Sequence, residues 1–281
     1  MTLIIFFSLS LLGQNYIEYY NLCNEAEKEL DLKNYNKALF LYETAFKKVD
    51  YIHAEKMSRA YKCAINCEKF ETGFTFAKTA ILKGFPIRYI KNIANRKFKR
   101  TKYYPTLIDS STYWLNLHNS KINQKYKNII DSLLFIDQKI IRGSNQKMTE
   151  FNINKKNLPT NLFDLDSEIF KTLLGSIEKY GFPSEQNIGY VTFANVWVLF
   201  HHNVRLPENR YYLPVLEKAL KRGDYLPRDF AWMYDQGCLN LGIEPLFYFY
   251  VPTDKIRKDK NKLVAINEIR KKYGVELFTI E

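Results

Sequence analysis

The most apolar internal stretch of the chain lies within Gly181–Asn203, where almost every residue after Gly189 is aromatic or branched. A segment of this kind must be covered by other elements, because exposing that much apolar surface to water is unfavourable. Its few polar residues, Thr192, Asn195 and His202, recur at helical spacing and would form one polar seam. The pattern therefore predicts a central buried helix, with a buried strand as the alternative that its Val, Tyr and Phe content leaves open.

Apolar stripes at helical spacing also run through residues 16–82, and they predict helical hairpins. An aromatic residue followed by two small residues occurs twice, 35 positions apart: Tyr35, Ala38 and Ala45, then Phe70, Gly73 and Ala80. Small residues at these places let neighbouring helices approach closely. The spacing looks like a tetratricopeptide-type repeat. Residues 14–85 are therefore expected to be tetratricopeptide-like helical repeats. Since two units leave a face uncovered, residues 86–119 are expected to cap or link them.

Residues 120–281 are expected to form a globular helical domain. A long amphipathic helix is predicted from about Ser120 to Arg142, and Asp166 is placed as the N-cap of a helix that ends at Tyr180. The apolar run at 246–251, LFYFYV, is strand-like. The fold class predicted for the whole chain is mainly α, with at most a short β element.

The N-terminus begins with a short apolar run, Leu3 to Leu12, followed by polar residues. This length is too short to span a bilayer but suits the apolar core of a secretory signal. Residues 1–13 are accordingly expected to be a signal peptide, with an exported (periplasmic or secreted) mature chain that has no transmembrane segment. A buried N-terminal helix is the alternative.

Composition describes an ordinary folded protein of 281 residues, 46% hydrophobic and 26% charged, with a net charge of +12. The densest basic and aromatic run, Arg88 to Tyr104, could bind a single-stranded nucleic acid by charge and stacking. A solvated helix face whose aromatics point inward explains the same pattern without a nucleic-acid fold, so no specific nucleic-acid partner is expected. The four cysteines have no metal-binding spacing and are expected to be small buried residues.

Four polar residues in the C-terminal half are candidates for one cluster. Asp137 falls inside an apolar stripe, and a carboxylate there is costly to bury unless it is paired. His202 ends the polar seam of the central segment, and the cheapest way to satisfy both is for them to meet. Arg142 would supply the compensating charge, and Asp235 is the expected fourth member.

A resemblance accompanies this set. Asp137-Gln138-x-x-x-Arg142, Asp166, Tyr180-Gly181-Phe182-Pro183, Gly189, His202 and the Ala231–Asp235 helix occur in this order. Residues 120–281 thereby resemble an uncharacterised bacterial family, a domain of unknown function often found behind helical repeats in exported proteins. Where that family tends to have Asn, Gln and Arg, this chain has Ile169, His201 and Gln236. The resemblance implies no reaction, because the family has none established.

Two functions follow from these patterns. The first is a protein-interaction or scaffold protein that binds a protein or peptide through its repeats, because no phosphate-binding glycine loop or catalytic serine, cysteine or metal motif occurs. The second is a hydrolase-like enzyme in which His202 acts with Asp137 or Asp235 as acid–base groups and Arg142 holds an anionic group. The catalytic residues stay unknown, and neither a cofactor nor a metal is expected.

Overall fold

The computed structural model describes residues 15–140, 162–204, 206–249 and 259–279. Within these ranges the secondary structure is helical and contains no strand. The prediction of a mainly α fold is therefore confirmed. The expected signal peptide and Arg142 lie outside the described ranges.

The N-terminal part consists of two helical hairpins. The first pairs α1 (Tyr16–Asp31) with α2 (Tyr35–Phe46), and the second pairs α3 (Ala54–Asn66) with α4 (Phe70–Leu82). Each hairpin turns at a non-glycine residue with positive φ, Lys33 in the first and Glu68 in the second. These two residues are 35 positions apart, so the backbone repeats with the period found in the sequence.

Small residues in the second helix of each hairpin are buried as predicted. Ala38 and Ala45 in α2 and Ala80 in α4 are fully covered, and Gly73 is also buried. A Cβ on Gly73 would lie 2.8 Å from Cγ2 of Ile65 in α3, so this position requires glycine for the helices to approach as they do.

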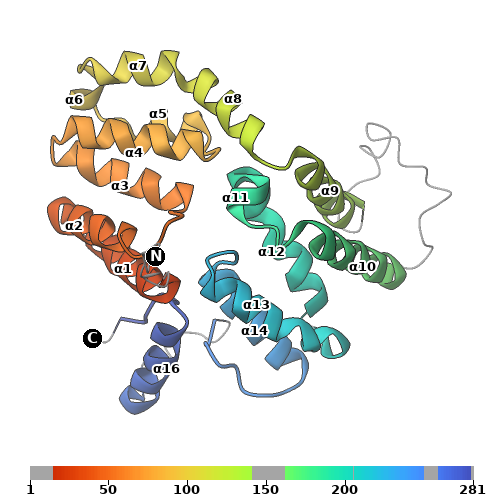
Figure 1. The fold of residues 1–281 in the computed structure, drawn as a ribbon. Helices are drawn as coiled ribbons and strands as arrows, with labels where there is room; N and C mark the ends of the chain where they lie inside the picture. The colour runs from red at the N-terminus through yellow and green to blue at the C-terminus, as the bar shows by residue number, and fades with distance from the viewer. Residues whose placement is uncertain (1–14, 141–161, 205, 250–258, 280–281) are drawn as a thin grey trace, which may run out of the picture.

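Four short helices cover the second hairpin: α5 (Ile87–Ile93), α6 (Arg96–Lys99), α7 (Tyr103–Asp109) and α8 (Ser111–Lys121). Both α7 and α8 pack on α4, and α8 leads across to the second half of the molecule (Figure 1). Within the basic run that spans α5 to α7, Phe98 points inward and is fully buried, whereas Tyr89 is exposed.

The second half is arranged around α12 (Tyr190–Val204). Its other elements are α9 (Gln124–Phe135), the π-helical turn η1 (Ile136–Ile140), α10 (Leu162–Tyr180), α11 (Glu185–Ile188), the 3-10 helix η4 (Pro207–Tyr212), α13 (Leu213–Lys221), α14 (Pro227–Asn240) and α16 (Lys260–Lys272). Helix α12 contacts α9, α10, α11, α14 and η4, so the predicted central segment is a helix with neighbours on most sides.

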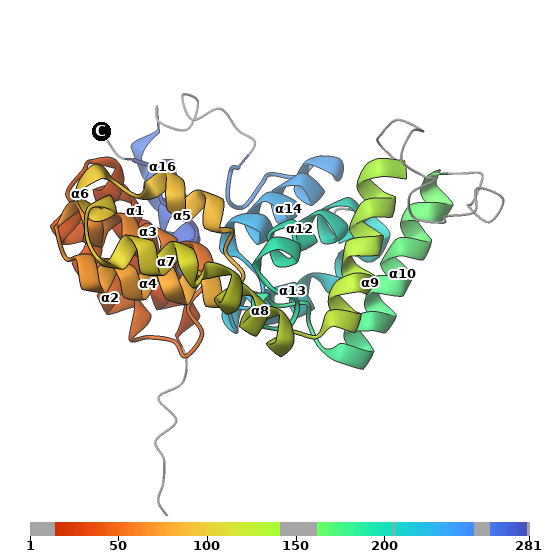
Figure 2. The ribbon, with the colours of Figure 1, turned by 90° about the horizontal axis from the view of Figure 1, so that it is seen from above.

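The chain closes on itself. Helix α16 and the residues after it return to α1, where the side-chain amides of Asn21 and Asn24 donate to the carbonyls of Lys271 and Gly274, both at 2.9 Å. The hairpins and the α9–α10 pair lie at opposite ends of the molecule, with α12 to α14 between them (Figures 1 and 2). One cluster of buried apolar side chains runs from Tyr16 to Val275 and includes both halves.

Three local predictions differ from the structure. The helix expected from about Ser120 to Arg142 is present but starts at Gln124, because Asn123 caps α9: its side chain accepts from the Tyr126 N–H at 3.0 Å. Asp166 is not an N-cap, since α10 begins at Leu162. Of the strand-like run at 246–251, residues 246–249 form no strand, because the Asp235 carboxylate takes the backbone N–H groups that a ladder would use, and residues 250–251 lie outside the described ranges.

Candidate functional site

His202 and Asp137 meet, as the sequence predicts. His202 is in the last turn of α12 and Asp137 in the π-helical turn η1, and His202 Nδ1 lies 2.9 and 3.0 Å from the two carboxylate oxygens. Asp137 is 0% exposed and His202 is 8% exposed. A carboxylate at Nδ1 places the hydrogen of the neutral ring on that nitrogen and orients the imidazole. The Gln138 amide also donates to Asp137.

Helix α12 carries a second polar link, to α9. Thr192 Oγ1, ten residues before His202, donates to the Asp131 carboxylate at 2.7 Å. Asn195 takes no part in either link, because it is exposed and its amide donates to the carbonyl of Val191. The predicted seam is therefore divided: Thr192 and His202 hold α12 to α9 and η1, and Asn195 faces solvent.

Asp235 does not join His202 and Asp137, although the sequence predicted it as the fourth member of their cluster. Its carboxylate accepts the backbone N–H groups of Leu246, Phe247 and Phe249 at 2.9, 2.9 and 2.7 Å. Burial raises the pKa of Asp235, while these three donors oppose the rise. The residue fixes the segment after α14, and that structural role explains its place on the buried side of the helix.

A second histidine–carboxylate pair, which sequence reasoning missed, joins the two halves of the molecule. His53 precedes α3 and Glu185 begins α11, and both side chains are almost fully buried, each residue 2% exposed. His53 Nδ1 lies 3.1 Å from Glu185 Oε2, while Glu185 Oε1 accepts the Ala54 N–H at 2.8 Å. The carboxylate thus also caps the N-terminus of α3.

Tyrosines enclose this pair. The Tyr51 hydroxyl donates to Glu185 at 3.2 Å, and the Tyr20 hydroxyl lies 3.1 Å from His53 Nε2. Both ring nitrogens of His53 are therefore engaged within the protein, which describes a structural link and leaves no nitrogen for a substrate. The cluster borders a cavity of about 320 Å³. A sequence signal for it existed in the tyrosines at i, i+3 and i+4 of α1, whose hydroxyls need partners when buried.

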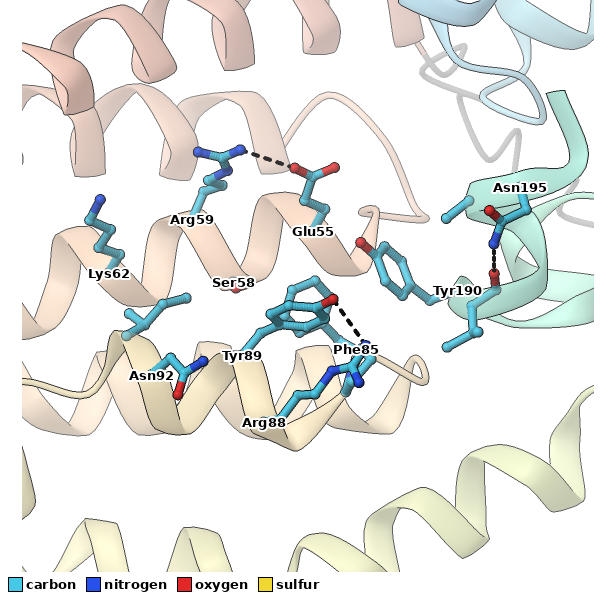
Figure 3. Close-up of a pocket in the computed structure, with 14 residues that line it drawn as sticks. Glu55, Ser58, Arg59, Lys62, Phe85, Arg88, Tyr89, Asn92, Tyr190 and Asn195 are labelled. Carbon is cyan, nitrogen blue, oxygen red and sulfur yellow. Dashed lines mark hydrogen bonds and ion pairs between the residues drawn. The ribbon is translucent and has the colours of Figure 1, made fainter. Parts of the chain in front are cut away.

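A pocket of about 520 Å³ lies between the second hairpin, α5 and the start of α12 (Figure 3). Three helix faces and one loop line it: Glu55, Ser58, Arg59 and Lys62 of α3; Phe85 and Pro86 before α5; Arg88, Tyr89, Asn92 and Ile93 of α5; and Tyr190, Val191, Ala194 and Asn195 of α12. The α3 residues follow the spacing i, i+3, i+4, i+7, so one helix face supplies them all. Among the described candidates, Asp137, His202 and Asp235 do not line this pocket.

Aromatic residues line the α5 and α12 sides of the pocket, while charged residues line the α3 side and, at Arg88, the α5 side. The Phe85 ring packs on those of Tyr190 and Tyr89, with centroids 4.8 and 5.7 Å apart. Tyr89 is 43% exposed and Val191 is 54% exposed, so apolar surface remains open to solvent. Arg59 pairs with Glu55 at 3.2 Å, and Arg88 donates to the Tyr89 hydroxyl at 3.1 Å (Figure 3).

The described residues contain no group of three or more His, Cys, Asp or Glu side chains placed to hold a metal ion. Among the helices in this part of the chain, none is both long and apolar enough to cross a bilayer. The four cysteines are free thiols, and Cys23, Cys63 and Cys238 are buried as predicted.

Comparison of the chain with protein-family models, curated proteins and solved structures gives no match. The resemblance of residues 120–281 to an uncharacterised bacterial domain therefore stays a prediction. Any function must be argued from the geometry of this chain itself.

Proposed function

We propose that this protein is an interaction protein that binds a peptide segment of a partner in the pocket between α3, α5 and α12. The single observation that carries the proposal is the pocket itself, about 520 Å³ and lined by solvent-facing Tyr89 and Val191 beside charged side chains. Recognition sites of this kind combine apolar area with a few orienting polar groups.

The hairpins support this function when they are taken as tetratricopeptide-like repeats. Buried small residues and the positive-φ turns recur 35 positions apart, and such repeats build concave binding surfaces. The resemblance of residues 120–281 to an uncharacterised domain behind such repeats agrees with the same proposal.

A displayed library of random peptides, selected on the immobilised protein, tests the proposal. Tyr89→Ala with Val191→Ser removes the exposed apolar contacts of the pocket, and Tyr113→Ala with Val215→Ser removes two exposed residues of the same types elsewhere. The expected result is a set of enriched peptides that binds the wild type and the Tyr113/Val215 variant but not the pocket variant. Enriched peptides that bind all three proteins equally would contradict the proposal.

A second candidate function, a hydrolase-like enzyme, is favoured by one observation, the buried His202–Asp137 contact at 2.9 Å. A histidine oriented by a carboxylate can act as a general base toward water. Wild type and His202→Gln should be assayed on activated carboxylic and phosphate esters and glycosides. A rate that the variant loses while its melting temperature is unchanged supports the enzyme, and equal rates refute it.

Export is part of the proposal, and its support is the apolar run from Leu3 to Leu12. N-terminal sequencing of the protein made in its native cell is expected to find a start near Gln14. Intact Met1 on the cytoplasmic protein would refute export and leave the peptide-binding proposal untouched.

A further inference from the structure

We infer that the segment bound in the pocket between α3, α5 and α12 is acidic, with an apolar side chain flanked by carboxylates. This inference rests on the proposed function and adds the chemistry of the partner. It follows from how charge and apolar surface are distributed over the pocket.

Three cations line the pocket against one carboxylate. Arg59, Lys62 and Arg88 carry positive charge, and Glu55 is the single anion, which Arg59 neutralises at 3.2 Å. Lys62 and Arg88 are both exposed, and neither forms an ion pair within the described part of the chain. The net charge of the lining is therefore positive, and the two exposed cations stand on opposite walls, α3 and α5 (Figure 3).

Apolar surface lines the α5 and α12 sides of the pocket. Tyr89, Phe85 and Tyr190 form a ring cluster on the side of α5 and α12, and Val191 extends it into solvent. An apolar side chain placed there would cover Tyr89 and Val191, while acidic neighbours along an extended segment would reach Lys62 and Arg88. Opposite charges at the rim speed the association of the peptide and fix its position in the pocket. The apolar contact supplies most of the affinity.

A single-stranded nucleic acid fits the same pocket less well. Binding by stacking needs several exposed aromatic faces along a basic groove, but Phe98 in the basic run is fully buried. Tyr89 is the aromatic residue of the pocket with a large exposed fraction, and it is already covered on one face by Arg88, at 4.8 Å from the ring centroid. A short acidic peptide needs one apolar contact, which this geometry provides.

The experiment uses the same displayed random-peptide library, read out by the composition of the enriched peptides. Three proteins are compared: the wild type, Lys62→Glu with Arg88→Glu, and the control Lys125→Glu, an exposed lysine on α9 away from the pocket. The wild type and the control are expected to select acidic peptides containing an apolar residue. The double variant is expected to bind them about tenfold more weakly and to select basic peptides instead.

Affinity for the selected peptides is also expected to fall as salt is raised, because exposed charge pairs are screened. Pocket-dependent peptides with no acidic bias would overturn this inference while leaving the proposed function intact. Peptides whose binding ignores Tyr89→Ala with Val191→Ser would overturn both. An oligothymidine strand could instead bind the wild type more tightly than the peptides do and fail to bind the double charge variant. That result would overturn the acidic peptide and identify the partner as a nucleic acid.

Discussion

Glu185 illustrates how one buried residue can hold distant parts of a chain together. Its carboxylate accepts from the Ala54 backbone and the Tyr51 hydroxyl and contacts His53, although these residues are more than 130 positions away. A carboxylate 2% exposed is stable only when such donors replace its water. The hydrogen bonds therefore couple α11 to the start of α3.

Glu185→Ala is expected to lower the free energy of unfolding by about 3–5 kcal/mol, because it leaves several buried donors without an acceptor. Chemical denaturation measures the loss. Gln186→Ala, an exposed neighbour in the same short helix, is the matched control and should change stability by less than about 0.5 kcal/mol. A Glu185 variant that matches this control would show that the buried cluster carries no stabilising link.

Asp229, in the first turn of α14, makes the stability of the protein depend on pH. Burial raises its pKa from 3.8 to about 7; Arg228 opposes the rise and Glu55 adds to it. Between about pH 4 and 7 the folded protein holds a proton that the unfolded chain has lost. Stability therefore falls as pH rises through this window.

Asp229→Asn removes the titrating group and should flatten that decline. The difference in unfolding free energy between variant and wild type is expected to grow in favour of the variant from about pH 4 to 7 and then level off. Thermal or urea unfolding at several pH values measures it, with the exposed Asp31→Asn as control. Parallel profiles for Asp229→Asn and wild type would refute the raised pKa.

Sequence reasoning found one of the two buried histidine–carboxylate pairs, for a physical reason. Asp137 and His202 each interrupt an apolar pattern, so each is visibly costly alone and predicts a partner. His53 stands at a helix start and Glu185 in a polar segment after Pro183, where such residues are ordinary. Their burial arises from the way α11 packs on residues 51–54, at the start of α3, and no pattern around His53 or Glu185 records that contact. The Arg142 prediction stays untested, and Asp235 was misplaced.

At the level of elements, the two helical hairpins were predictable because small residues lie where their helices cross. Gly73→Ala tests this packing. Alanine is the better helix former, but its Cβ would lie 2.8 Å from Cγ2 of Ile65, so overpacking of about 1–3 kcal/mol should exceed the gain in helix propensity.

Gly175→Ala is the matched control for Gly73→Ala. This glycine is also inside a helix, α10, but nothing lies within 4 Å of its added Cβ. The control should stabilise the protein by about 0.5–1 kcal/mol. Urea unfolding measures the free energy of unfolding of both variants. If both variants gain stability, or both lose it, the close approach of α3 and α4 is contradicted.

Element boundaries were less predictable than element type. The apolar stripe through Ile122 and Tyr126 is continuous, yet the helix breaks there because Asn123 caps α9 and its own N–H donates to the carbonyl of Asn187 at 2.9 Å. The strand-like run after Pro245 fails for a similar reason, since Asp235 binds its backbone. In both places a contact from a distant segment overrides the local preference.

At the scale of the whole molecule, the two ends of the chain support each other. The backbone after α16 packs on α1, where Asn21 and Asn24 donate to carbonyls 250 positions away. Gly274 permits this contact in two ways: its φ is +70°, and a Cβ there would lie 2.8 Å from Cβ of Tyr20. The first and last helices should therefore unfold together.

Gly274→Ala is the test of this coupling, and Gly242→Ala is its control. Gly242 follows α14 with nearly the same φ, +67°, but nothing lies within 4 Å of its added Cβ. Gly242→Ala should cost only the left-handed strain, about 1–2 kcal/mol. Gly274→Ala should cost about 1–3 kcal/mol more, since Tyr20 must also shift. Hydrogen exchange of the Gly274 variant is expected to speed up in α1 and α16 alike. If the two variants lose equal stability, or if exchange rises only in residues 274–279, the ends of the chain are not coupled.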